Sequence, residues 1–251
     1  MTDLRVKRDG PLMQVTFDRP HRLNAFTMSM YAALGNLCDE LAQEQDIKVL
    51  VLRGAGGRAF AAGNEISDFL EVDPVEHEQW IRELLQRLFA LPQVTVAAID
   101  GVCVGGGLAV ATHCDLRLAT QGSRFGYPIA QTLGNALSAG MVYRCLAVFG
   151  ESLTREMLLT SRLLTADRAY AAGALLAVTN DLERELDDVV NGLLHSSGET
   201  LRITKHQLLA WAARHEVSPL DDDDLLREAY TGPDFAEGVR AFLAKEKPNF
   251  R

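Results

Sequence analysis

Two glycine-bearing segments of the sequence could expose backbone N–H groups to a bound anion. The first spans residues 57–66 and ends in Gly63-Asn64-Glu65-Ile66, and the second spans residues 100–109 and contains Gly105-Gly106-Gly107. Glycines at a helix start leave backbone N–H groups accessible, because no Cβ blocks an approaching ligand. Two donors from separate loops can hold one developing oxyanion, commonly with a few kcal/mol of stabilisation per donor. The alternative is that both segments are only tight turns between a strand and a helix.

Strands and helices predicted around these segments would position them. Short β-rich runs at residues 48–53 and 94–99 each precede one of the glycine segments, and residues 13–17 and 115–119 also have strand character. Thr27 can cap a helix whose apolar stripe is Met30, Leu34, Leu37 and Leu41. Residues 80–91 and 108–112 are also expected to be helical. Strands alternating with helices predict a parallel, helix-covered α/β layer in the first half, and the strand-poor second half predicts a helical region.

Composition excludes several classes of function. The chain has 251 residues, 47% of them apolar, and a net charge of −9. This is enough chain for one large core, and the negative charge argues against nucleic-acid binding and against an anionic membrane surface. It allows an anionic small molecule held by a few Lys or Arg side chains. The only charge run, 221–224 (DDDD), is expected to be a solvated loop.

Cysteine usage and the start of the chain predict a cytoplasmic protein. Cys38, Cys103, Cys114 and Cys145 form no C-x-x-C pair, and the charged opening residues lack the apolar core of a signal peptide. We expect four free and mostly buried thiols. The longest uncharged stretch, residues 101–114, is too short to span a bilayer.

Several motifs follow one another along almost the whole chain. They are residues 18–25 (DRPHRLNA), 59–66 (AFAAGNEI), 101–107 (GVCVGGG), 114–117 (CDLR), 125–128 (FGYP) and a closing segment, 234–242 (DFAEGVRAF) with 247–250 (KPNF). In this order they resemble the motifs of the crotonase superfamily, also called the enoyl-CoA hydratase/isomerase family. One such motif would be a weak signal, but the ordered set is specific for the superfamily.

The resemblance implies a fold, a ligand and a site. The fold would be α/β, a crotonase-like spiral of ββα units, with an acyl-CoA-binding core at 1–195 and a helical oligomerisation and active-site-capping region at 196–251. The protein would form homotrimers or hexamers. Acyl-CoA would be the substrate, with no separate cofactor and no metal. The backbone N–H groups of Asn64 and Gly106 would form the oxyanion hole, and the resemblance makes the following residues candidates for contacts with CoA: Arg22, Ala62, Lys247 and Phe250.

The chain departs from the family at both acid/base positions. Hydratases of the family use two glutamates, but the first position is occupied here by Ala109 and the second by Ile129, or by Ala130 if the extra residue before Gly134 is placed differently. General acid–base catalysis is typically worth about 10²–10⁴-fold per group, so the loss of both groups should cripple water addition. Candidates for a replacement acid or base are few, and each also has a structural interpretation. They are Glu65, which takes the place of a helix-capping aspartate of the family, Asp68, Tyr127, Gln131 as an orienting group, and His77, for which an exposed helix surface is the more ordinary expectation.

Three functions therefore remain open. The first is an enzyme that processes acyl-CoA through a stabilised enolate with a non-standard acid/base; isomerisation, decarboxylation, C–C cleavage and thioester hydrolysis all fit such a hole. The second is a weak enoyl-CoA hydratase. The third is a non-catalytic acyl-CoA-binding or scaffold protein. The intact pair of glycine segments favours the first.

Overall fold

The larger of two β-sheets forms the framework of the molecule. The computed structural model describes residues 3–67, 73–215 and 222–250. This sheet has six strands in the order β1-β2-β3-β5-β7-β10, and all neighbours are parallel except the antiparallel pair β1–β2. The strands are β1 (Leu4–Asp9), β2 (Leu12–Phe17), β3 (Val49–Gly54), β5 (Val94–Ile99), β7 (Leu116–Thr120) and β10 (Ala177–Thr179). Every residue of β5 is buried, as expected for a central parallel strand covered on both faces.

The smaller sheet carries the two glycine segments. Its four strands, in the order β4-β6-β8-β9, are β4 (Ala59–Ala62), β6 (Val102–Val104), β8 (Arg124–Gly126) and β9 (Leu164–Thr165). Strand β4 ends directly before Gly63 and β6 ends directly before Gly105. Because β4 and β6 are parallel neighbours, their carboxyl ends, and hence the two glycine segments, meet at the same edge of this sheet.

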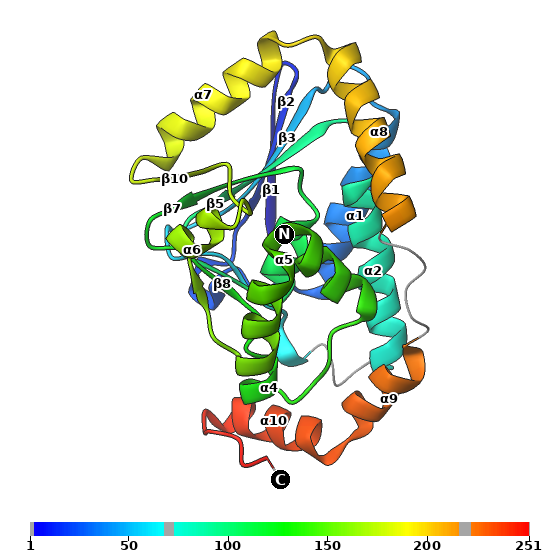
Figure 1. Cartoon of the computed structure of the whole chain (residues 1–251), viewed down its shortest axis with the longest axis vertical. Helices are drawn as coiled ribbons and strands as arrows, with labels where there is room; N and C mark the ends of the chain where they lie inside the picture. Colours follow the sequence, from blue (N-terminus) through cyan, green and yellow to red (C-terminus); the bar gives the residue numbers. More distant parts are fainter. Residues whose placement is uncertain (1–2, 68–72, 216–221, 251) are drawn as a thin grey trace.

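Helices cover both faces of the main sheet (Figure 1). Helices α1 (Met28–Gln43) and α2 (Pro74–Phe89) contact each other, and both contribute to the main apolar core. Helix α7 (Leu182–His195) packs Leu182, Leu186 and Val190 against a second cluster built on β3, β5 and β7. The remaining helical elements are η1 (Pro20–Arg22), α3 (Gly106–Thr112), α4 (Ile129–Thr132), α5 (Ala139–Thr160), α6 (Ala166–Ala171), α8 (Gly198–His215), α9 (Asp223–Thr231) and α10 (Pro233–Ala244).

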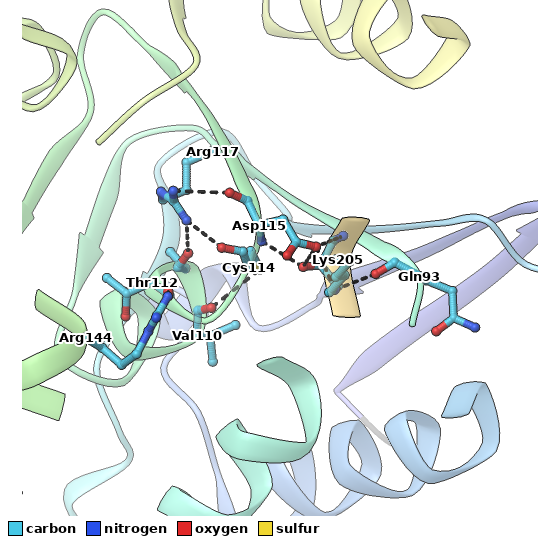
Figure 2. Close-up of polar contacts among 10 residues, drawn as sticks. Gln93, Val110, Thr112, Cys114, Asp115, Arg117, Arg144 and Lys205 are labelled. Atoms are coloured by element: carbon cyan, nitrogen blue, oxygen red, sulfur yellow. Dashed lines mark hydrogen bonds and ion pairs between the residues drawn. The ribbon is translucent and has the colours of Figure 1, made fainter. Parts of the chain in front are cut away.

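The helix that follows the second glycine segment is braced at its far end by two arginines (Figure 2). Arg117 donates to the carbonyls of Ala111 and Cys114, at 3.3 and 2.6 Å, and Arg144 donates to the carbonyl of Thr112 at 2.7 Å. The last carbonyls of a helix have no partner inside the helix, and cations there complement its dipole. The two side chains therefore fix α3, whose first residue is Gly106.

Most of the predicted elements are confirmed. Thr27 caps α1 by accepting the amide of Met30 at 3.2 Å, and the predicted strands at 48–53 and 94–99 correspond to β3 and β5. Helix α2 starts at Pro74, six residues before the predicted start at 80, because Asp73 accepts the amides of Val75 and Glu76. All four cysteines are free and buried, as expected.

The expectation of a solvated loop at residues 221–224 is wrong for Asp222 and Asp223, whereas Asp224 is exposed but lies in the first turn of α9. Asp222 is only 5% exposed, and its carboxylate accepts the amide of Ala139. Asp223 accepts a hydrogen bond from Gln79 at 2.6 Å, which ties the start of α9 to α2. Asp222 and Asp223 thus make tertiary contacts, which a count of charges does not reveal.

The predicted division at residue 195 falls between α7 and α8. The described residues from 198 to 244 are almost entirely helical, and the division into two domains stays a prediction. No helix within residues 3–67, 73–215 and 222–250 combines the length and the apolar character needed to cross a membrane.

Candidate active site

The two glycine segments lie so close together that a Cβ at Gly105 or Gly106 would crowd the facing loop. A Cβ placed on Gly105 would lie 3.0 Å from the Cα of Gly63, and one placed on Gly106 would lie 2.1 Å from the Oδ1 of Asn64. Gly63 and Gly105 also adopt positive φ angles of 87° and 53°, which favour glycine. The sequence therefore folds into two abutting loops at the end of the smaller sheet.

Two backbone N–H groups at this junction are available to a ligand. Among the described residues, neither the Asn64 amide nor the Gly106 amide has a hydrogen-bond acceptor. Gly106 is the first residue of α3, where the amides have no acceptor inside the helix. The neighbouring Glu65 amide, by contrast, donates to the carbonyl of Phe26 at 2.7 Å and so fixes the first loop. Both residues also line the same cavity, so two unengaged N–H donors lie at its wall.

The Asn64 side chain is held in place from α1. The Tyr31 hydroxyl donates to the Oδ1 of Asn64 at 2.9 Å, and the Tyr31 ring stacks on Phe26 with ring centroids 4.7 Å apart. Burial raises the pKa of Tyr31 above the ordinary value for a phenol, so the hydroxyl keeps its proton and acts as a donor. Tyr31 thus orients the residue that carries one of the two free amides.

A cavity of about 90 Å³ opens beside the two amides. Its walls are mainly apolar, and they include Ile66, Ile81, Ile129, Leu133, Leu137 and Met141. Ala109 and Ile129, which stand where the resemblance would place two glutamates, both line the cavity. The two positions therefore face the same space as the amides, but their side chains cannot hold or move a proton.

The C-terminal helices supply part of the cavity wall. Tyr230 on α9 lines the cavity, and its hydroxyl accepts a hydrogen bond from the Nδ2 of Asn135 at 3.1 Å. Asn135 also lines the cavity. A residue far along the chain thus contributes to the cavity wall, and the capping role of the region at 196–251 stays a prediction.

The candidate acids and bases lie in different surroundings. Tyr127 is buried and lines the cavity, with its hydroxyl close to the Cys145 thiol; burial raises the pKa of Tyr127 well above that of an ordinary phenol. Glu65 is not among the cavity-lining residues, and its carboxylate forms an ion pair with Arg19 at 3.0 Å. Asp68 lies outside the described residues.

The two remaining candidates lie away from the cavity. The exposed Gln131 side chain donates to the carbonyl of Thr160 at 3.2 Å. The expected exposed surface position for His77 is wrong, because this residue is 4% exposed and its ring lies beside that of Trp80. Neither residue lines the cavity.

The candidate CoA contacts come from the first quarter and the last residues of the chain. Ala62 directly precedes Gly63, and its amide donates to the carbonyl of Leu23, next to the exposed Arg22. Phe250 is half-buried, and a Cβ placed on Gly134 would lie 3.1 Å from its ring. Lys247 is exposed. The roles of these residues stay predictions. In the part of the chain that the structure describes, no three His, Cys, Asp or Glu side chains gather as metal ligands would.

One functional candidate, Glu78, was missed at the sequence level. It lies on α2, is 9% exposed and lines the cavity. Burial raises its pKa above the ordinary value for a carboxyl, and contacts with Ser138 and the charge of Arg82 offset only part of this effect. A signal was present in the sequence, since Glu78 continues the buried stripe of α2 formed by Ile81, Leu85 and Leu88.

Comparison with known proteins gives a consistent result. The family model described as enoyl-CoA hydratase/isomerase matches residues 7–251. A 2,3-dehydroadipyl-CoA hydratase of Escherichia coli K12 is 29% identical over 255 residues, covering 100% of this chain and 99% of that protein. A 1,2-epoxyphenylacetyl-CoA isomerase of the same organism is 29% identical over 250 residues, covering 95% and 94%.

Solved structures show the same likeness. The crystal structure of an enoyl-CoA hydratase/carnithine racemase from Magnetospirillum magneticum has 31% sequence identity and a TM-score of 0.80, covering 100% of this chain and 96% of that chain. The likeness confirms the predicted crotonase-like α/β fold. The chain belongs to the enoyl-CoA hydratase/isomerase family, that is, to the crotonase superfamily.

Proposed function

We propose that the protein is an acyl-CoA-processing enzyme whose Asn64 and Gly106 amides stabilise a thioester enolate. One observation carries the proposal: two amides without acceptors, from abutting loops, meet beside a mainly apolar cavity. Preorganised donors of this kind act strongly in a site from which water is excluded, because they need no reorganisation as charge develops.

In an isomerisation, the reaction begins at the carbon next to the thioester carbonyl. A proton leaves C2, its bonding electrons form a C1–C2 double bond, and the carbonyl π electrons move onto oxygen. The amides of Asn64 and Gly106 donate to that oxygen. Isomerisation is one of several reactions that pass through this enolate. Because the donors belong to the backbone, the nearby side chains can differ from one such reaction to another.

Water addition is the alternative function, and a relative named as a 2,3-dehydroadipyl-CoA hydratase favours it. Hydration needs one group to take a proton from water and another to protonate C2. Ala109 and Ile129 cannot do either. Enolate chemistry without water addition is therefore the better proposal for this cavity.

The first expected result is conversion of one class of acyl-CoA by the purified protein. A mixed panel of saturated, 2-enoyl, 3-enoyl, 3-hydroxy, 3-oxo and malonyl-type thioesters would be followed by chromatography and mass spectrometry. We expect a product reached through the enolate: a shifted double bond, loss of carbon dioxide or a cleaved chain. Gain of water would establish the hydratase instead, and tight binding without any product would establish a binding protein.

A spectroscopic measurement separates the oxyanion hole from the proton-transfer step. The absorption of 2,4-hexadienoyl-CoA, whose diene is conjugated to the thioester, should shift to longer wavelength when the amides polarise its carbonyl. A bound thioester with an unshifted spectrum would contradict the proposed role of Asn64 and Gly106.

We further propose that CoA is bound as part of the substrate, with contacts from Arg22, Ala62, Lys247 and Phe250. Arginine suits phosphate geometry, and Phe250 lies close to the cavity-lining segment around Gly134. No separate cofactor is proposed. The four free thiols support a cytoplasmic protein, since thiols stay reduced there.

A trimer, alone or paired into a hexamer, is the proposed assembly. Its support is a set of exposed apolar side chains on the C-terminal helices, namely Ile203, Leu208, Trp211, Leu225, Phe242 and Leu243. Native mass spectrometry should give a mass three or six times that of the 27.5 kDa chain. A monomer at micromolar concentration would contradict this assembly.

A further inference from the structure

Glu78 brings a carboxyl group into a cavity that is otherwise apolar or uncharged. Of the described residues that line it, Glu78 alone carries a carboxyl group. We propose that Glu78 is the catalytic acid/base, which takes a proton from C2 of a bound 3-enoyl thioester and returns it at C4. This inference rests on the proposed function, because the proton becomes acidic only when the two amides hold the enolate oxygen.

Helix α2 holds Glu78 firmly in its place. The helix starts from the Asp73 cap, and Ile81, Leu84 and Leu85 are all buried, so this face of α2 cannot turn away from the core. Gln79 fastens the same turn to α9 through its hydrogen bond with Asp223. The carboxyl group is therefore presented to the cavity by a rigid element, which catalytic positioning requires.

The charged and titratable groups around Glu78 come from several elements. Arg82 follows one turn later on α2 and favours the carboxylate, whereas Asp222 at the start of α9 disfavours it. The Nη1 of Arg82 also lies 4.0 Å from the Oδ1 of Asp222. The surrounding hydroxyl groups are those of Ser138 before α5 and of three tyrosines, Tyr31, Tyr127 and Tyr230.

These surroundings suit Glu78 to the work of a base. A carboxyl whose pKa is raised by burial is a stronger base once it is ionised, and it becomes a usable acid after it has taken a proton. The three tyrosines have raised pKa values, chiefly because of burial, and stay neutral. They can donate hydrogen bonds but cannot accept the proton.

One carboxyl group is sufficient for moving a double bond. Glu78 takes a proton from C2; the C–H electrons form a C1–C2 double bond and the carbonyl electrons move onto oxygen, giving a dienolate. Glu78 then returns the proton to C4. The C3–C4 π electrons form the new C–H bond, the C1–C2 pair becomes a C2–C3 double bond, and the carbonyl re-forms. No other reactant is consumed, and the product is a 2-enoyl thioester.

The test measures turnover of 3-hexenoyl-CoA by the wild-type protein and by the variant Glu78→Gln, in ordinary and in deuterated water. Glutamine keeps the size and the hydrogen-bonding atoms but cannot accept a proton, so kcat should fall about 10²–10⁴-fold. Binding of 2,4-hexadienoyl-CoA and its spectral shift should stay unchanged. Glu83→Gln is the matched control, because Glu83 is an exposed carboxyl on the same helix, and it should keep the wild-type rate.

The pH dependence gives a readout that a structural role would not move. Proton abstraction needs the carboxylate, so the wild-type rate should rise with pH through a single pKa that lies above the usual carboxyl value. Glu78→Gln should lose this step. Glu78→Asp keeps a carboxyl one methylene further back, and it should keep the pH step with a slower rate.

The possible failures are distinguishable. If Glu78→Gln turns over 3-hexenoyl-CoA at the wild-type rate, Glu78 is not the base, while an intact spectral shift would leave the proposed enolate function standing. A loss that occurs in Asp68→Asn and not in Glu78→Gln would likewise overturn the assignment. If the wild-type protein neither shifts the spectrum nor converts any thioester, the proposed function itself fails.

Discussion

Gly106→Ala is expected to lower kcat for acyl-CoA turnover by about 10³-fold, the upper end of the loss seen when one oxyanion donor is removed. The new Cβ would lie 2.1 Å from the Oδ1 of Asn64 and 2.5 Å from the Tyr31 hydroxyl. Neither separation is tolerable, so the Asn64 side chain must give up its hydrogen bond with Tyr31. The substitution therefore disturbs both proposed donors, because Asn64 carries the second amide.

The measurement for Gly106→Ala is steady-state turnover together with the 2,4-hexadienoyl-CoA spectrum. The spectral shift should disappear, which separates this variant from Glu78→Gln. Gly122→Ala is the matched control, because a Cβ at this turn position meets no atom within 4 Å. Turnover and spectral shift that are unchanged in Gly106→Ala would show that this amide does not act on the thioester.

Lys205→Met is expected to destabilise the fold by about 2–3 kcal/mol. Lys205 reaches from α8 to the start of β7, where its Nζ lies 2.7 Å from the Oδ2 of Asp115 and 2.6 Å from the carbonyl of Gln93 (Figure 2). Breaking a buried ion pair commonly costs about 3–5 kcal/mol. We expect less here, because the Asp115 side chain is 23% exposed and keeps hydrogen bonds from Thr95.

Chemical denaturation at fixed protein concentration measures this loss, because oligomerisation makes apparent stability depend on concentration. The double variant Lys205→Met/Asp115→Asn removes both charges and should recover part of the stability. A loss below about 0.5 kcal/mol in the single variant would mean that α8 is held by its apolar contacts alone.

Much of the fold could be predicted because local signals agree with the final packing. The stripe from Met30 to Leu41 has helical spacing, and Thr27 caps it in the structure as the sequence indicates. The acidic run at 221–224 could not be interpreted in this way. Asp222 is buried because Ala139, 83 residues away, donates its amide to it, and no local pattern records such a partner.

The sequence predicted the backbone part of the site better than its side-chain part, because only the backbone part depends on a local pattern. Its backbone part depends on glycines, which the chain marks visibly at positions 63, 105 and 106. The side-chain part depends on tertiary partners: Glu65 is engaged by Arg19, 46 residues earlier, whereas Glu78 is enclosed by elements that meet only in the folded protein. In the sequence, Glu78 could be recognised as a carboxyl group on the apolar stripe of a helix. Such a position predicts burial but not a catalytic role.

Ala109 and Ile129 also bear on how such a site can diverge. Both residues line the cavity, whereas the proposed oxyanion donors beside them belong to the main chain. A single side-chain replacement can remove or introduce a proton-handling group, but it leaves main-chain amides in place as long as the glycines persist. The main-chain amides and the proton-handling side chains can therefore change independently of each other. A protein with this fold can thus acquire a different reaction when a carboxyl group is lost at one position of the cavity wall and gained at another, while the two proposed amide donors stay the same.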